Sequence, residues 1–108
     1  MSNPDCLFCK IAAKEAPSTI VSEDDDILVF KDLYPSAPVH LLVIPKKHIS
    51  SLFDLTDEDE ALMGKIVRAL PKLAKEHGLD RGFKTQINTG KGGGQEVMHI
   101  HFHLMGRP

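Results

Sequence analysis

The feature that most constrains this chain is a strict alternation of histidine and apolar residues near its C-terminal end. Residues 99–104 read His-Ile-His-Phe-His-Leu. In a β-strand, residues i, i+2 and i+4 point to one face, so this segment predicts three imidazoles on one side and a core contact on the other. Neighbouring imidazoles would lie about 7 Å apart at Cα, which is the scale of a phosphate group with its hydrogen bonds.

The remaining pattern predicts short strands and two helices. The chain has 108 residues, 42% of them hydrophobic and 26% charged, which is typical of one folded domain spanning residues 1–108. The segments that read as strands are 20–22, 27–31, 39–44, 83–88 and 97–105. This order predicts an α+β fold with a five-stranded antiparallel sheet, in which the strand at 83–88 is half-buried.

The two helices are predicted from their start and stop signals. Asp5 is placed to cap a short helix over residues 6–14. Thr56 begins the longer helix, with Asp59 in a variant of the capping box, and Gly78 ends it. An apolar stripe at helical spacing predicts the face that packs on the core: Leu62, Ile66, Leu70, Leu73 and His77.

Charge and hydropathy exclude two classes of partner. The 13 Lys and Arg residues against 15 Asp and Glu give a formal net charge of −2. This balance lacks the basic footprint of a protein that binds a nucleic-acid duplex. No segment approaches the ~20 apolar residues of a membrane span, and residues 1–5 lack the features of a signal peptide. We therefore expect a cytoplasmic protein with no membrane partner.

Three imidazoles on one face allow two kinds of chemistry. A neutral imidazole is a competent nucleophile, and its ordinary pKa of ~6.5 leaves much of it unprotonated at pH 7. The alternative is a metal held by all three rings, although a third ligand on a straight strand converges poorly. A plain exposed strand face is the third interpretation. The glycine-rich loop at 90–94 favours phosphoryl chemistry, because its backbone N–H groups can approach an anion closely.

The sequence resembles the histidine triad (HIT) superfamily in three segments. Residues 88–105 contain its naming pattern, His-φ-His-φ-His-φ-φ with φ apolar, and residues 30–40 and 41–50 look like its second block. The most similar branch is the histidine triad nucleotide-binding proteins, which are purine nucleoside phosphoramidases. The resemblance implies a purine nucleotide ligand of AMP or GMP type and no cofactor required for catalysis. It also implies a homodimer whose two five-stranded sheets join into one ten-stranded sheet.

The resemblance implies a mechanism as well. His101 would attack the α-phosphorus of a nucleoside 5′-phosphoramidate and expel the amine, and water would then hydrolyse the nucleotidyl-histidine to the nucleoside monophosphate. His103 would hold phosphate oxygens. The backbone carbonyl of His99 would orient the His101 ring, and His40 would complete the proton network.

The same resemblance implies the nucleotide-binding residues. Asp32 matches the acceptor of the ribose hydroxyls. Phe8, Ile11 and Leu33 match the apolar walls around the purine. Asn88, Gly94 and Gln95 match the residues on the phosphate side. Glu96 departs from relatives that carry serine against the leaving group. We expect its carboxylate to repel a polyphosphate and to favour a cationic amine.

The pair Cys6 and Cys9, spaced C-x-x-C, has three interpretations. It is a redox motif, a pair of reduced thiols on the first helix, or half of a structural zinc site. Zinc-bearing relatives in the wider superfamily imply Cys6, Cys9, His48 and His99 as the four ligands, which leaves His101 free for chemistry.

Three alternatives to the phosphoramidase stay open at this point. One is a dinucleoside polyphosphate hydrolase of the same superfamily. Another is a nucleotide-binding regulatory protein whose catalysis is incidental. The third is a metal-dependent hydrolase.

Overall fold

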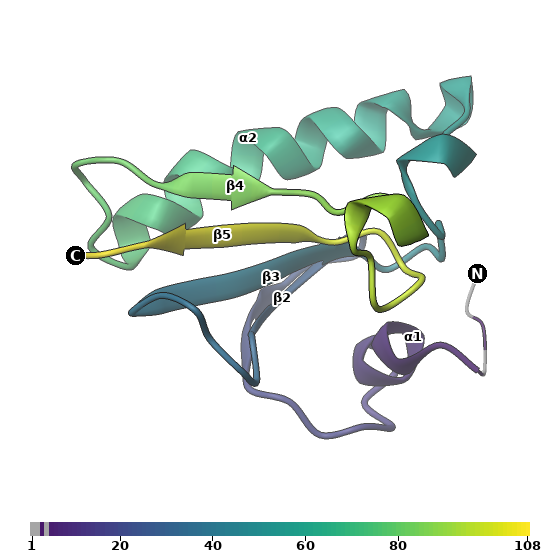
Figure 1. The fold of residues 1–108 in the computed structure, drawn as a ribbon, viewed down its shortest axis with the longest axis horizontal. Helices are drawn as coiled ribbons and strands as arrows, with labels where there is room; N and C mark the ends of the chain where they lie inside the picture. The colour runs from purple at the N-terminus through teal and green to yellow at the C-terminus, as the bar shows by residue number, and fades with distance from the viewer. Residues whose placement is uncertain (1–2, 4) are drawn as a thin grey trace.

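The computed structural model describes residue 3 and residues 5–108, and it contains one five-stranded sheet with a helix on each face (Figure 1). The strand order is β1-β2-β3-β5-β4, and every neighbouring pair is antiparallel. The predicted α+β fold with two helices is therefore confirmed. The elements are α1 Leu7–Ala12, β1 Ile20–Glu23, β2 Ile27–Lys31, β3 Val39–Pro45, α2 Glu60–Glu76, β4 Lys84–Gln86 and β5 Phe102–Gly106, with single 3-10 turns at Leu52–Asp54, Asp57–Asp59 and Lys91–Gly93.

The central strand β3 is buried on both faces, because side chains alternate across the sheet and each face has its own helix. Leu41 and Val43 join the core beneath α2, together with Ile66 and Leu70. The intervening residues Leu42 and Ile44 join a second core beneath α1, with Phe8, Leu28 and Phe30. This two-sided burial explains why 39–44 reads as a continuous apolar run rather than an alternating one.

The histidine segment alternates as predicted, but its strand is shorter than predicted. Ile100, Phe102 and Leu104 lie in the core beneath α2, and the histidines lie on the α1 side. Regular pairing begins only at Phe102. Before that point the backbone bonds elsewhere, because the N–H of Ile100 donates to the carbonyl of Ile49 at 2.7 Å and the N–H of His99 donates to that of Val97 at 2.9 Å.

The long helix follows its sequence signals closely. It is preceded by the 3-10 turn Asp57–Asp59, and Thr56 and Asp59 form the predicted capping box. The backbone N–H of Thr56 donates to Oδ2 of Asp59 at 3.0 Å. Gly78 follows the helix with a φ of 80°, a left-handed conformation that favours glycine.

Two further sequence predictions need correction. The first helix begins at Leu7 and is capped by Cys6 rather than Asp5, because the Cys6 sulfur accepts the N–H of Cys9 at 3.4 Å. The strand predicted as half-buried over 83–88 is β4, which covers only Lys84–Gln86 and is exposed throughout. It is the last strand of the sheet, and among the described residues it pairs only with β5 and has no neighbour at its outer edge. No helix of the described residues is long and apolar enough to cross a membrane.

Candidate active site

A cavity of about 660 Å³ lies between α1, the residues after β2 and the glycine-rich loop. It reaches His101 and His103, so it joins an apolar chamber to two imidazoles. Most of the residues predicted to bind a nucleotide line it: Phe8, Ile11, Asp32, Leu33, Asn88, Gly94 and Glu96. The volume and the mixed lining are typical of a pocket for a small ligand.

His101 presents an unprotonated nitrogen to this cavity. Its Nδ1 lies 2.7 Å from the carbonyl oxygen of His99, and a carbonyl can only accept, so the proton must be on Nδ1. The lone pair therefore lies on Nε2. Burial lowers the pKa of the His101 ring, which keeps it neutral at pH 7. Phe8 packs edge-on against the ring, with the centroids 5.1 Å apart.

His103 has the opposite tautomer, set by a chain of hydrogen bonds that begins at the backbone of Ser36. The N–H of Ser36 donates to Nδ1 of His40 at 3.0 Å, so His40 carries its proton on Nε2. That Nε2 lies 2.8 Å from Nδ1 of His103 and donates to it. His103 is thus left with a proton on Nε2, and it offers a donor to the cavity beside the acceptor of His101.

Asp32 completes this chain at its side. One oxygen, Oδ1, accepts the backbone N–H of Tyr34 at 2.8 Å, and the other, Oδ2, lies 3.3 Å from Nε2 of His40. Burial is the main cause that lowers the pKa of His103, followed by the neighbouring rings of His101 and His40. The group is therefore a hydrogen-bonded network beside one carboxylate, in which burial favours the neutral forms of His101 and His103.

The spacing of Asp32, His40 and His103 would suit a metal ion, but the hydrogen bonds oppose one. A metal on Nε2 of His40 would require the proton on Nδ1, where the Ser36 N–H already donates. The rings of the triad also do not converge on one ion, because His99 turns toward Cys6 and Cys9. The interpretation of one ion held by His99, His101 and His103 is therefore wrong.

The glycine-rich loop is shaped by two amide side chains. Nδ2 of Asn88 donates to the carbonyl of Gly93 at 2.7 Å, and Gly94 has a φ of 79°. Gln95 is buried behind the loop, where its Oε1 accepts the N–H of Gly90 and its Nε2 donates to the carbonyls of Ser50 and Val97. Gln95 therefore holds the loop in place and does not line the cavity.

A second cluster lies beneath the first histidine and contains the four residues suggested as zinc ligands. The sulfur of Cys6 lies 3.3 Å from Nδ1 of His99, and that of Cys9 lies 3.3 Å from Nδ1 of His48 and 3.5 Å from Nδ1 of His99. All four ligand atoms lie within 4.8 Å of one another. A tetrahedral zinc shell with two sulfurs and two nitrogens needs separations of about 3.4–3.8 Å.

The chemistry of the cluster also fits a zinc ion. Nε2 of His99 donates to the carbonyl of Pro45 at 2.8 Å, which leaves a lone pair on the Nδ1 that faces the sulfurs. Burial lowers the pKa of His99 to about 4, so the ring is neutral. Burial also raises the pKa of the Cys6 thiol, so without a cation this thiol keeps its proton and donates to Nδ1 of His99. The redox interpretation lacks its usual context, because in the described part of the chain no strand precedes Cys6.

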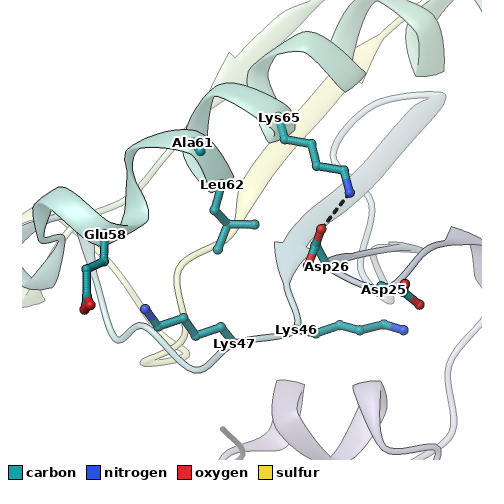
Figure 2. Close-up of a pocket in the computed structure, with 8 residues that line it drawn as sticks. All are labelled: Asp25, Asp26, Lys46, Lys47, Glu58, Ala61, Leu62 and Lys65. Atoms are coloured by element: carbon teal, nitrogen blue, oxygen red, sulfur yellow. Dashed lines mark hydrogen bonds and ion pairs between the residues drawn. The ribbon is translucent and has the colours of Figure 1, made fainter.

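Another hollow, of about 580 Å³, lies away from the histidines and carries no comparable chemistry (Figure 2). Figure 2 shows Lys65 paired with Asp26, beside Lys46 and Lys47. Lys46 pairs with Glu23 and Lys47 pairs with Asp59, so each lysine that lines the hollow has a carboxylate partner. The lining has no unpaired cation to hold a phosphate.

Sequence reasoning did not find the residues that set the tautomers. Ser36 acts through its backbone N–H, which every residue except proline has, so its side chain gives no signal. Pro45 contributes only its backbone carbonyl, so its side chain gives no signal either. The backbone N–H of Tyr34 donates to Asp32 and forms a short turn. The only sequence signal for this turn is an acidic residue in a loop two positions before Tyr34.

The fold and the site together define an α+β protein with paired neutral histidines beside a nucleotide-sized cavity. A family model described as "Scavenger mRNA decapping enzyme C-term binding" matches residues 5–108. Protein HitA of Neisseria gonorrhoeae is 56% identical over 104 residues, covering 96% of this chain and 97% of that protein. A crystal structure of a HIT family hydrolase from Legionella pneumophila Philadelphia 1 is 50% identical with a TM-score of 0.93, covering 96% of this chain and 94% of that one. The chain belongs to the histidine triad superfamily.

Two further relatives are described by zinc. The 14 kDa zinc-binding protein of Brassica juncea is 44% identical over 104 residues, covering 94% of this chain and 92% of that protein. A Zn-bound histidine triad family protein from Mycobacterium smegmatis is 37% identical, with a TM-score of 0.82, covering 96% of this chain and 76% of that one.

Proposed function

We propose that this protein is a hydrolase that cleaves the P–N bond of purine nucleoside 5′-phosphoramidates through a nucleotidyl-histidine. The observation that carries the proposal is the pair of opposite tautomers: His101 offers a lone pair and His103 offers an N–H to the same cavity. A phosphoryl group needs both, a nucleophile at phosphorus and a donor for the charge on its oxygens. The description of similar solved structures as HIT family hydrolases supports hydrolysis in general.

The reaction would proceed in two displacements. Nε2 of His101 forms a bond to the α-phosphorus as the P–N bond breaks, and the amine leaves with a proton taken from water. The positive ring of the nucleotidyl-histidine keeps its Nδ1–H on the carbonyl of His99. Water then attacks phosphorus and loses a proton, which releases the nucleoside monophosphate and restores neutral His101. His103, held by His40, donates to a phosphoryl oxygen in both steps.

The remaining cavity residues would bind the nucleoside. Phe8, Ile11 and Leu33 provide apolar walls for a purine, and Leu33 is 76% exposed, so a base would cover it. Asp32 has the carboxylate that would accept a ribose hydroxyl. Asn88, Gly94 and the loop held by Gln95 would lie along the phosphate.

Glu96 would set the preference for the leaving group. It is exposed at the cavity margin, close enough to stabilise a positive charge on His101. Its carboxylate would attract a cationic amine and repel a polyphosphate. This charge favours the phosphoramidase over the dinucleoside polyphosphate hydrolase.

Three properties accompany this proposal. The cluster of Cys6, Cys9, His48 and His99 would hold a structural zinc ion, and a bound ion would take both sulfurs as thiolates. Residues 1–108 would act as a single domain. The exposed edge strand β4 leaves room for a homodimer with a continuous ten-stranded sheet. The protein would work in the cytoplasm.

Parallel assays with adenosine 5′-phosphoramidate and diadenosine tetraphosphate test the proposal. We expect the phosphoramidate to be hydrolysed with the higher kcat/KM. Turnover at saturating substrate should persist in excess EDTA, because no step needs a metal at the phosphate. A higher kcat/KM for the tetraphosphate would support the polyphosphate hydrolase instead. A rate that EDTA abolishes at once and that added Mg²⁺ restores would support a metal-dependent hydrolase.

A further inference from the structure

His99 contacts both the cysteine cluster and the nucleophile His101, the first through its ring and the second through its backbone carbonyl. Its ring faces the sulfurs of Cys6 and Cys9 through Nδ1 and is fully buried. Its backbone carbonyl accepts the Nδ1–H of His101 at 2.7 Å and so sets which nitrogen of that ring is free. A ligand that fixes the His99 ring therefore also fixes the group that orients His101.

The helix α1 is a second link between the clusters. It has only six residues, too few to be stable as an isolated helix, so its position depends on what its side chains contact. Cys6 caps this helix and Cys9 lies within it, and both sulfurs belong to the cysteine and histidine cluster. Two other residues of α1 face the active site: Phe8 packs edge-on against His101, and Ile11 lines the cavity.

The segment 97–101 has little regular structure to hold the nucleophile without help. Strand pairing of β5 begins at Phe102, one residue after His101. Before it, the backbone is held by the bonds of His99 to Val97 and of Ile100 to Ile49, and by the His99 ring on Pro45. Gln95 also donates to the carbonyl of Val97, and Ile100 packs in the core. An anchor on the His99 ring would therefore add to a small set of contacts that hold this segment.

We propose that a zinc-type divalent ion in the cluster of Cys6, Cys9, His48 and His99 positions the active site, so that metal occupancy controls nucleotide affinity. The ion would join α1 to the 97–101 segment and hold the wall of the cavity against the nucleophile. Cys6, Cys9 and His48 are then positioning residues, which act through His99 and Phe8 and do not touch the substrate. The effect on nucleotide affinity rests on the proposed function. The effect of the ion on the positions of α1 and the 97–101 segment does not.

The test compares the reduced protein with one equivalent of Zn²⁺ and the same protein stripped of metal. Three quantities are measured: the Kd for AMP by calorimetry, the amide hydrogen exchange of each segment, and the NMR signal of the His101 ring N–H. We expect removal of zinc to raise the Kd about tenfold, a typical effect of losing support around a site. Exchange should accelerate in 7–12 and 97–101 but not in β2 and β3, and the ring signal should broaden or vanish.

A matched pair of variants separates positioning from general stability. His48→Gln removes a ligand that lies outside both α1 and the histidine segment, and we expect it to behave like the stripped protein even with Zn²⁺ present. His77→Gln is the control, because His77 lies at the end of α2 and its Nδ1 bonds to the carbonyl of Leu73. It should keep the full zinc response. If His48→Gln does not fold, Cys9→Ser takes its place.

Two results would overturn the proposal outright, and a third, uniform acceleration of exchange, would replace the positioning role by general stabilisation. One is a protein that fails to bind zinc, and the other is a protein that binds it with no change in segmental exchange or in the ring signal. If exchange and the ring signal respond while AMP does not bind in either form, the proposed function fails and the positioning role stands. If zinc removal accelerates exchange equally in β2 and β3, the ion is a general stabiliser and the positioning role is wrong.

Discussion

At the scale of single residues, the chemistry of the site depends on which ring nitrogen carries a proton. His101 and His103 are two residues apart with ring centroids separated by 5.1 Å, yet their tautomers are opposite. The cause is their partners, a backbone carbonyl that accepts from His101 and the Nε2–H of His40 that donates to His103. The sequence could predict that these imidazoles share a face, because that follows from the period of a strand. It could not predict the tautomers, because Ser36 contributes only a backbone N–H.

A substitution series at His103 tests its role as a donor. His103→Ala removes the Nε2–H, and we expect kcat/KM to fall by about 10²–10³, the usual cost of one donor to a developing oxyanion. His103→Gln should lose less, because its amide retains an N–H. The measurement is the steady-state rate on adenosine 5′-phosphoramidate, with Tm as a check on folding. Equal losses in the two variants would argue against the donor role.

The leaving-group preference is also a property of one residue. Glu96→Gln keeps the size of the side chain and removes its charge, so the ratio of kcat/KM for a cationic phosphoramidate over diadenosine tetraphosphate should fall several-fold. Raising the salt concentration should shrink the native ratio in the same direction, since the side chain is exposed. Glu76→Gln, on the exposed end of α2, is a charge-matched control. An unchanged ratio in Glu96→Gln would mean that Glu96 does not select the leaving group.

At the scale of elements, local signals predicted α2 well and predicted α1 and β5 less well. The capping box of Thr56 and Asp59 and the buried stripe are local features of the sequence, so they were readable. The start of β5 was not, because Ile100 bonds to Ile49, which lies in a distant segment. The cap of α1 was misassigned because a cysteine sulfur replaces the usual oxygen acceptor.

The start of α2 gives a prediction for the dependence of stability on pH. The hydrogen bond from Lys47 is the main cause that lowers the pKa of Asp59, with the backbone N–H of Thr56 second. A carboxylate whose pKa is lower in the folded state stabilises the protein above its unfolded pKa of about 3.9, and this stability is lost as pH falls through the lower folded value. Asp59→Asn should therefore lower Tm at pH 7.

The same variant should lose its effect in acid. The difference in Tm between the native protein and Asp59→Asn should shrink as pH falls below about 4, and thermal unfolding followed by circular dichroism at pH 7 and pH 3 measures it. Asp57→Asn, an exposed residue of the same turn, is the control and should change Tm little at either pH. A difference that stays constant between the two pH values would contradict the assigned role of the Asp59 charge.

At the scale of the whole molecule, the sheet brings together residues that are far apart in the sequence. Antiparallel pairing of β3 with β5 sets Leu42 opposite His103, and this register places His40 beside His103. The α1 face similarly brings Cys6 and Cys9 to His48 and His99. Strand register depends on contacts across the sheet, so the sequence pattern alone could not give these separations. The resemblance to the superfamily supplied the residue sets, and the fold supplies the contacts that explain them.

The proposed reaction depends on a covalent bond between His101 and phosphorus, and this bond can be trapped. Isotope-labelled adenosine 5′-phosphoramidate is mixed with the protein, the reaction is quenched within milliseconds, and the peptides are analysed by mass spectrometry. We expect an adenylate on His101 that alkali preserves and acid releases, that is absent from His101→Ala, and that His77→Ala retains. An adenylate on another residue, or hydrolysis by His101→Ala at the native rate, would contradict it.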